Sequence, residues 1–195
     1  MNHKLSNEYE RYDDYRQVFQ AVLNLTCSLS ISSLVSAILT AADRMDNIFI
    51  IGNGGSASTA SHFSEDLSKG TRPPDSEWFP KAISLTDNTS YITALGNDEG
   101  YQNIFIGQLR PLALEPDLLI AISVSGNSSN ILSAVNWANQ RKLITFGLTG
   151  FTGGELASIA SDCIQVPSDD FGIVESAHSF ILHYIVDTLN KHWLL

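Results

Sequence analysis

The sequence is poor in charged residues and poorer still in basic ones. Only 16% of its 195 residues are Asp, Glu, Lys or Arg, against roughly 25% in an average soluble chain. Lys and Arg number 11 and Asp and Glu number 21, which gives a formal net charge of −10. Binding a phosphate backbone needs an excess of Lys and Arg, so this balance excludes nucleic-acid binding as the main function. The shortage of charge also predicts that part of the surface is hidden in an oligomer.

Cysteines and long apolar runs are scarce as well. Cys27 and Cys163 are far apart and form no CxxC spacing, which excludes a disulfide framework and a cysteine zinc site. Because a free cysteine usually behaves as a small core residue, we expect both thiols to be buried. No apolar run approaches the roughly 18 residues of a membrane span, and the N-terminal MNHKLSNEYERYDDYR is polar. We therefore expect a soluble, cytoplasmic protein.

The sequence contains enough apolar material for one domain with a large core. Apolar residues make up 44% of the chain, and its length needs no metal or disulfide to hold a fold together. Apolar positions spaced by three and four in residues 18–25 and 34–42 predict two N-terminal helices. We take residues 1–195 as a single domain, in which the helices of residues 1–45 pack on the domain or in an oligomer interface.

Short β-branched runs alternate with helical patterns over the rest of the chain. The predicted strands are NIFII from Asn47 and residues 82–85, 117–123, 143–148 and 163–166. The predicted helices are residues 58–67, 90–95 with 102–109, 130–139, 154–159 and 174–193. This alternation is typical of an α/β fold with a parallel sheet of about five strands and helices on both faces. One loop, KGTRPPDSEWFP at residues 69–80, is rich in proline and is interpreted as a lid, a subunit contact or a plain surface connection.

Two loops after predicted strands are candidates for ligand binding. Gly52-Asn53-Gly54-Gly55-Ser56 joins a strand to a helix, the position where open α/β folds bind ligands. It contains neither the GxGxxG of dinucleotide folds nor the Lys of a P-loop, and a glycine turn is the alternative interpretation. Ser123-Val124-Ser125-Gly126-Asn127-Ser128 also leads from a strand into a helix, so its hydroxyls and N–H groups favour a phosphate. Helix capping by a serine is the alternative there.

Histidines and carboxylates recur at helical spacing in two segments. His62 and Asp66 are four residues apart, with Glu65 beside them. Glu175 and His183 are eight apart, about two turns, on the C-terminal helix. Two such pairs converging on one divalent metal would give the mixed nitrogen and oxygen ligands that zinc accepts. Glu175 with His178 would serve as well, and ion pairs on the helix surface are the alternative.

Several motifs follow one another along the chain: GNGGSASTASHF, GNDEGY, SVSGNS, LTGFTGG, and VPSDD followed by VESAHSFILH. Taken together, these motifs resemble the sugar isomerase (SIS) domain family, and within it the sedoheptulose 7-phosphate isomerases, or phosphoheptose isomerases. The resemblance covers residues 47–189 with the order and spacing of the motifs kept.

The resemblance implies a fold, an assembly and a reaction. The fold is a flavodoxin-like three-layer sandwich around a five-stranded parallel sheet, with extra N-terminal helices. The assembly is a homotetramer with active sites between subunits, and the reaction is a metal-assisted ketose to aldose isomerisation of a phosphosugar with Zn²⁺ or another divalent metal. The implied substrate-binding residues are Asn53, Gly54, Gly55, Ser56, Asn97, Asp98, Ser123, Ser125, Gly126, Asn127, Ser128 and Glu175. The implied metal ligands are His62, Asp66, Glu175 and His183.

The sequence departs from the family pattern at two of the four implied metal ligands and at one neighbouring position. Asp66 stands where the family has a Glu that also acts as acid and base, Glu175 stands where it has a Gln, and Ser176 where it has a Glu. Two carboxylates neutralise a divalent cation, so metal binding should survive. Because Asp is shorter than Glu by a methylene group, the proton transfers are assigned to Asp66 or Glu65 together with His183.

The predicted reaction is the conversion of sedoheptulose 7-phosphate to D-glycero-D-manno-heptose 7-phosphate through an enediol. One alternative is an isomerase of a different ketose phosphate in a specialised sugar pathway. Another is a non-catalytic SIS protein that binds a phosphosugar or acts as an adaptor. A sugar-phosphate dehydrogenase is disfavoured because the dinucleotide fingerprint is missing.

Overall fold

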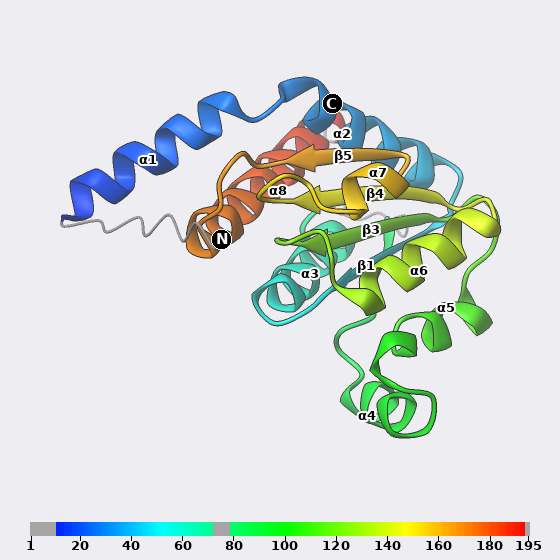
Figure 1. Cartoon of the computed structure of the whole chain (residues 1–195). Coiled ribbons are helices and arrows are strands. Elements are labelled where there is room, and N and C mark those ends of the chain that lie inside the picture. The colour runs from blue at the N-terminus through cyan, green and yellow to red at the C-terminus, as the bar shows by residue number, and fades with distance from the viewer. Residues whose placement is uncertain (1–10, 72–78, 194–195) are drawn as a thin grey trace.

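Five parallel strands form the centre of the molecule (Figure 1). The computed structural model describes residues 11–71 and 79–193. The strands lie in the order β2-β1-β3-β4-β5, and every neighbouring pair is parallel. Their bounds are β1 Asn47–Gly52, β2 Lys81–Ser84, β3 Leu118–Ser123, β4 Ile144–Thr149 and β5 Asp162–Gln165. The predicted fold class is thus confirmed.

Helices cover both faces of this sheet and make three layers (Figure 1). One layer consists of α1 Tyr12–Leu25, α2 Ser28–Asp43, α3 Gly55–Glu65 and α8 Phe171–Trp193. The other consists of α4 Thr89–Asp98, the 3₁₀ turn η2 Tyr101–Asn103, α5 Ile106–Leu112, α6 Ser129–Gln140 and α7 Leu156–Ile159.

The continuous apolar strands follow from this two-sided burial. In β1, Ile48 and Ile50 belong to the core under α2, α3 and α8, whereas Phe49 and Ile51 belong to the core under α4, α5 and α6. All four side chains are fully buried. Side chains alternate between the faces of a strand, so a strand covered on both faces is apolar at every position.

The strand order fixes where a ligand can bind. The chain leaves β1 toward β2 and later returns to place β3 on the other side of β1. In sheets of this order, a crevice opens outside the carboxyl ends of the strands at the point where the order reverses. That point lies between the loops that follow β1 and β3, which are the two loops singled out from the sequence.

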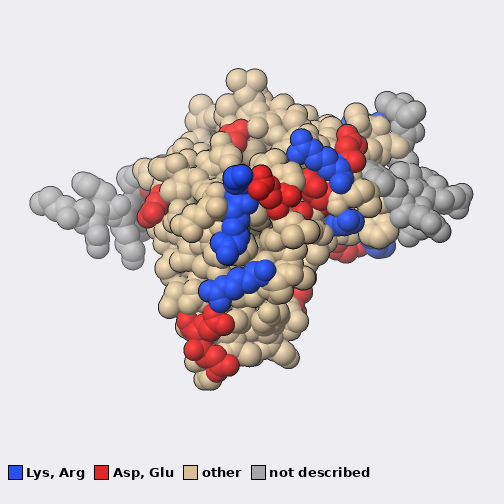
Figure 2. Space-filling model, turned by 90° about the vertical axis from the view of Figure 1, so that its right-hand side faces the viewer, with Lys and Arg blue, Asp and Glu red and all other residues tan. Residues whose placement is uncertain are grey.

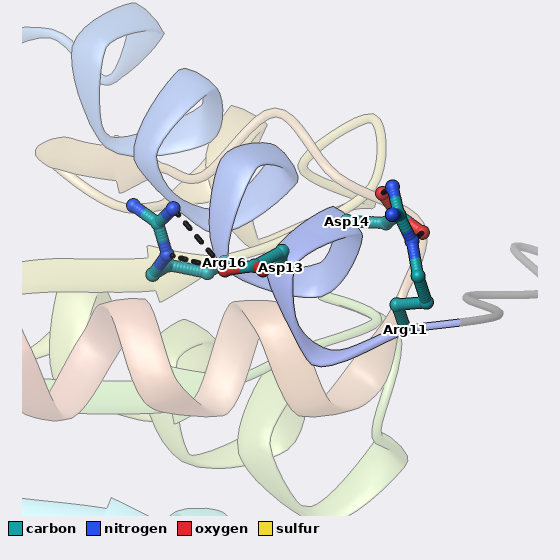
Figure 3. A network of polar contacts seen from close by, with 4 residues as sticks. All are labelled: Arg11, Asp13, Asp14 and Arg16. Atoms are coloured by element: carbon teal, nitrogen blue, oxygen red, sulfur yellow. Dashed lines mark hydrogen bonds and ion pairs between the residues drawn. The ribbon is translucent and has the colours of Figure 1, made fainter.

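The two N-terminal helices differ in how firmly they pack. Leu34 and Ile38 of α2 are fully buried against the sheet, while Val22 is the one buried residue of α1 and retains a small exposed area. The first turn of α1 is held by ion pairs of Arg11 with Asp14 at 3.0 Å and of Arg16 with Asp13 at 3.3 Å (Figure 3). The two aspartates also suit the positive end of the helix dipole.

The prediction that both thiols are buried is wrong for Cys27, because it precedes α2 in the short α1–α2 connection and is exposed. Hydrogen bonds from the backbone of Ser30 and Leu29 lower the pKa of Cys27. Cys163 on β5 is partly buried, and burial raises its pKa. Of the proline-rich loop, residues 72–78 lie outside the described residues, and so do the predictions made for them.

The surface view agrees with the scarcity of charge. Figure 2 shows a face on which basic side chains lie beside acidic ones, and most of that face carries neither. Among the described helices, none is by itself long and apolar enough to span a membrane; α1 and α2 meet those limits only as a pair bent by 68°.

Candidate active site

A polar cavity of about 180 Å³ lies at the reversal of the strand order. Asn53 and Ser56 line it from the loop after β1 and the start of α3. The remaining lining residues are Ile122, Ser123, Val124, Ser125 and Ser128 from β3 and its loop, and Phe171 and Glu175 from α8. The structure therefore brings together the two loops that the sequence marked as candidates.

Glycines allow the backbone of the serine loop to approach the backbone of the loop after β4 closely. Gly126 has a φ of +65°, and a Cβ on it would collide with the carbonyl oxygen of Gly153. Asn127, predicted to bind substrate, braces the loop: its side chain accepts from Glu155 N–H at 3.0 Å and donates to the Ser125 carbonyl at 3.0 Å. Neither Gly126 nor Asn127 lines the cavity.

Two helices begin at the cavity without a side-chain cap. Gly54, which has no side chain to cap with, precedes α3, and Ser128, which precedes α6, makes no side-chain hydrogen bond to its helix. Among the described residues, only the Ile131 N–H in the first turn of α6 has a side-chain acceptor, Asn130 Oδ1. By contrast, the Asn88 side chain accepts from Tyr91 N–H at the start of α4, away from the cavity. The capping interpretation of the serine loop is therefore not what the structure describes, because the Ser128 hydroxyl lies against the Ser123 hydroxyl at 3.4 Å instead. An uncapped helix start presents free N–H groups and a partial positive charge to an anion.

A cluster of two imidazoles and a carboxylate lies farther along α3 and α8. His62 Nε2 is 3.6 Å and His183 Nε2 is 3.8 Å from the same oxygen of Asp66. One ligand atom of each residue lies within 4.8 Å of the others, and the two rings meet edge to face with centroids 5.0 Å apart. Asp66 begins a π-helical turn, Asp66–Gly70, a local widening that is common at functional sites.

Glu175 does not join this cluster within one chain. Its carboxylate lies against Gly55 at the start of α3, where a Cβ on residue 55 would overlap it, and it lines the polar cavity. Eight residues of helix separate Glu175 from His183, a rise of about 12 Å. The sequence interpretation used the shared helix face and ignored the rise along the axis. Of the four implied metal ligands, His62, Asp66 and His183 come together within one chain, and Glu175 lies apart from them.

Other predicted residues lie elsewhere. Glu65 forms an ion pair with Lys69 at 3.1 Å and is not part of the His62, Asp66 and His183 cluster. Asn97 donates to Asp98 at 2.8 Å on the exposed side of α4, and neither residue lines the cavity.

Sequence reasoning missed Phe171 because it started the last helix at residue 174. The sequence signal for an earlier start is Asp170, because aspartate often caps the first turn of a helix. In the structure, Asp170 accepts a hydrogen bond from Ile173 N–H at 3.0 Å. Phe171 packs edge to face on Phe151, with centroids 5.1 Å apart, and forms one wall of the cavity.

A buried histidine supports the serine loop indirectly, through the end of β4. The ring of His178 is 1% exposed, and its Nε2 lies 3.1 Å from the Thr149 carbonyl at the end of β4. The next residue, Gly150, donates its N–H to the Val124 carbonyl at 2.8 Å. Burial lowers the pKa of His178 to about 4, so the ring is neutral at physiological pH.

Comparison with known proteins places these features among sugar isomerases. A model of the SIS domain family matches residues 11–150. The chain is similar to the phosphoheptose isomerase of Aneurinibacillus thermoaerophilus, with 40% identity over 140 residues, 72% of this chain and 70% of that one. It is 35% identical over 159 residues to the phosphoheptose isomerase of Helicobacter pylori (strain Shi470), 82% of each chain. The structure of a phosphoheptose isomerase from Francisella tularensis superposes with a TM-score of 0.83 at 32% identity, covering 92% of this chain and 95% of that one.

Proposed function

The chain belongs to the SIS domain family, among the phosphoheptose isomerases, and from that membership we propose that it interconverts sedoheptulose 7-phosphate and D-glycero-D-manno-heptose 7-phosphate. The observation that carries this proposal is that a polar cavity lined by serines and a cluster of two histidines and an aspartate lie along the same two helices, α3 and α8. The reaction oxidises C1 from alcohol to aldehyde while it reduces C2 from ketone to alcohol. It therefore needs no external oxidant or reductant.

The phosphate is assigned to Ser123, Ser125 and Ser128 at the start of α6. The cavity brings these three hydroxyls together, and the uncapped helix favours an anion there. The corresponding position at the start of α3 is already filled by the Glu175 carboxylate. Like charges repel, so the phosphate of the substrate is directed to α6 and its sugar lies toward Asn53, Ser56 and Glu175.

A divalent metal is assigned to His62, Asp66 and His183. Ligands at the corners of a tetrahedron, about 2.1 Å from a zinc ion, lie about 3.4 Å apart. The separations of 3.6 and 3.8 Å between the histidine nitrogens and the Asp66 oxygen are close to that value, so the donor set fits the metal. When bound, the ion supplies Lewis-acid polarisation of a substrate oxygen.

The proton transfers are assigned to Asp66 and His183, with Glu65 as the alternative base. A base removes a proton from C1, and the C–H electron pair forms the C1=C2 bond of an enediol as the oxygen on C2 gains a proton. The proton is then returned to C2, and the oxygen on C1 loses its proton to give the aldehyde. Imidazole suits such exchange because it gains and loses a proton near neutral pH.

We also propose that the chain is a homotetramer with active sites between copies. Within one chain, Ser56 and His62 are six residues apart on α3, a rise of about 9 Å, and Glu175 lies about 12 Å from His183 along α8. A second copy would allow the cluster of one chain to face the cavity of another. Exposed apolar side chains beside the cluster support such contacts: Phe180 and Tyr184 on α8 are 56% and 55% exposed.

Turnover tests the reaction directly. Purified protein saturated with Zn²⁺ is incubated with sedoheptulose 7-phosphate, and the aldose 7-phosphate is separated and quantified. We expect the aldose to accumulate to an equilibrium that is also reached from the product side. Absence of turnover in metal-replete protein would reject the substrate, and a panel of other ketose phosphates would then identify an isomerase of different specificity. Phosphosugar binding without turnover of any member would support a non-catalytic role.

A further inference from the structure

The amide of Asn53 is held in a reciprocal pair with the amide of Asn130. Asn53 Nδ2 donates to Asn130 Oδ1 at 2.9 Å, and Asn130 Nδ2 donates to Asn53 Oδ1 at 2.9 Å. Asn53 follows β1 and lines the cavity, whereas Asn130 lies in the first turn of α6 and is 1% exposed. The pair therefore bridges the two loops that make the cavity.

A backbone group fixes which way round the pair is arranged. Ile131 N–H donates to Asn130 Oδ1 at 3.0 Å, so that atom is an acceptor and the other end of the Asn130 amide is the donor. Reversal of the Asn130 amide would turn its NH₂ group toward this N–H. Because the two amides bond reciprocally, the orientation of Asn130 also determines that of Asn53.

Tyr101 also constrains the orientation of the Asn53 amide. Its hydroxyl donates to Asn53 Oδ1 at 3.1 Å, which agrees with the orientation set by Asn130. Gly100, with a φ of +87°, allows the turn that begins η2 and brings Tyr101 across from the end of α4. The GNDEGY segment thus reaches the cavity region through its last residue rather than through Asn97 or Asp98.

The hydrogen bonds leave one group of Asn53 for a ligand. Its oxygen accepts from Asn130 and from Tyr101, and one N–H donates to Asn130. Among residues 11–71 and 79–193, the second N–H of this amide has no hydrogen-bond partner. Asn53 is part of the cavity wall, so this N–H is available to an acceptor inside it.

We propose that Asn130 and Tyr101 are positioning residues that hold the Asn53 amide so that its remaining N–H donates to an oxygen of the bound phosphosugar. This inference rests on the proposed function for the identity of the ligand. A free asparagine side chain offers either its oxygen or its NH₂ group to a ligand, whereas the held amide offers only a donor. The cavity therefore selects an acceptor oxygen at this point, next to the serines that receive the phosphate.

The test uses a matched pair of tyrosines on the same side of the sheet. Tyr101→Phe removes the hydroxyl that bonds Asn53, and Tyr91→Phe removes a hydroxyl that donates to the Gly107 carbonyl at 3.2 Å. Binding of an open-chain seven-carbon polyol phosphate and of inorganic phosphate is measured by calorimetry. We expect Tyr101→Phe to weaken polyol phosphate about fivefold, as for one neutral hydrogen bond, and to leave inorganic phosphate unchanged. Tyr91→Phe should change neither. Equal weakening of both ligands by Tyr101→Phe would overturn the assignment.

A double-mutant cycle separates positioning from general stabilisation. If Tyr101 acts through Asn53, Tyr101→Phe should have no further effect on polyol phosphate binding in the Asn53→Ala background. Additive losses would contradict the inference. In the steady state, Tyr101→Phe should raise KM with kcat retained, because the bond to the sugar is expected in both ground and transition states. Tyr101 is 57% exposed, so this variant does not depend on repacking the core.

Side-chain amide resonances give a readout that is independent of turnover. In ¹H–¹⁵N spectra, Tyr101→Phe should shift the Asn53 NH₂ pair, and polyol phosphate should shift one of its two protons far more than the other. Equal shifts of both protons, or none on saturation with the ligand, would contradict the inference. If the wild type binds polyol phosphate with this pattern but turns over no ketose phosphate, the proposed reaction fails while the positioning role stands. If the wild type binds no polyol phosphate at all, both fail.

Discussion

The serine cavity and the histidine cluster lie along the same two helices but are built in opposite ways. In the cavity, Ser56 and Ser123 are each 5% exposed, and loop glycines and backbone hydrogen bonds fix the positions of the hydroxyls. In the cluster, the side chains of His62 and His183 are 58% and 57% exposed, and both face one carboxylate. The fold thus buries the hydroxyls of the cavity, whereas it leaves the imidazoles of the cluster accessible to solvent.

The cavity and the cluster also differ in the charged groups that they contain. The cavity contains no Lys or Arg among its described lining residues, and its one charged member is Glu175. An anionic substrate approaching a chain of net charge −10 therefore depends on helix dipoles and neutral donors for attraction. In the cluster, two histidines and an aspartate form a donor set that could hold a metal ion. Under the proposed function, neutral donors would bind the phosphate, whereas ionisable groups would act on the reacting carbons.

The largest expected effect separates catalysis from phosphate binding. Asp66→Ala removes the carboxylate that both histidines face and should lower kcat about a thousandfold, since it removes a metal ligand and a proton-transferring group. Binding of inorganic phosphate in the cavity should be unchanged. The measurements are steady-state kinetics, metal content by elemental analysis, and calorimetry.

The control for Asp66→Ala is its neighbour. Glu65→Ala removes a carboxylate that is paired with Lys69 on the surface and should change kcat less than threefold. A large loss of kcat in Glu65→Ala with little loss in Asp66→Ala would reverse the assignment of the base.

Acid should destabilise the fold through the buried ring of His178, which lies against the end of β4 beneath the serine loop. Because burial lowers the pKa of His178 to about 4 from an unfolded value of 6.5, the unfolded chain binds more protons between these values. The contribution of His178 to the free energy of unfolding is therefore fully present above about pH 6.5. It is lost as the pH falls toward 4, by a total of about 3 kcal/mol. Urea unfolding at a series of pH values measures the slope.

Replacement of His178 tests the origin of that slope. His178→Gln keeps a donor within reach of the Thr149 carbonyl and does not titrate, so it should flatten the dependence of the unfolding free energy between pH 6.5 and 4. His192→Gln, at an exposed position near the end of α8, should leave the slope as it is. An unaltered slope in His178→Gln would show that the acid sensitivity arises elsewhere.

Replacing the loop glycines by alanine should have a smaller effect on stability. Two such variants distinguish a steric collision of the new Cβ from strain in the backbone. Gly126→Ala places a Cβ against the Gly153 carbonyl at a φ of +65°, and should cost about 2–3 kcal/mol of stability and weaken phosphate binding. Gly54→Ala, at a φ of +56° and a ψ of −122°, has open space around the Cβ, so it tests backbone strain without a collision and should cost about 1–2 kcal/mol. Thermal unfolding and phosphate titration of both variants provide the comparison, and equal losses would argue against contact between the loops.

Most of the fold follows from the sequence because burial on both faces of a parallel sheet leaves a strong signal. The runs around Ile50 and Ile120 are apolar at successive positions, and both lie in central strands. Boundaries were less predictable. The Gly55–Ser56 start of α3 is marked by no cap, and Cys27 looks like a core residue although it occupies a helix connection.

The site could be predicted where neighbouring residues carry it and not where distant elements meet. The serine loop and the His62–Asp66 pair are local, so their spacing indicates their geometry. Glu175 and His183 share a helix face, but only the rise along α8 separates them into different regions. The Asn130 and Tyr101 bonds to Asn53 connect residues 77 and 48 positions away, and local patterns carry no trace of them.

The most direct test of the account is turnover and phosphate binding measured together on one preparation of the zinc-loaded protein and its Asp66→Ala and Ser125→Ala variants. The account predicts isomerisation of sedoheptulose 7-phosphate by the unaltered protein. It predicts loss of turnover with phosphate binding retained in Asp66→Ala, and weaker phosphate binding with a raised KM in Ser125→Ala. Turnover that survives Asp66→Ala, or phosphate binding lost equally in both variants, would contradict the division of work between cluster and cavity.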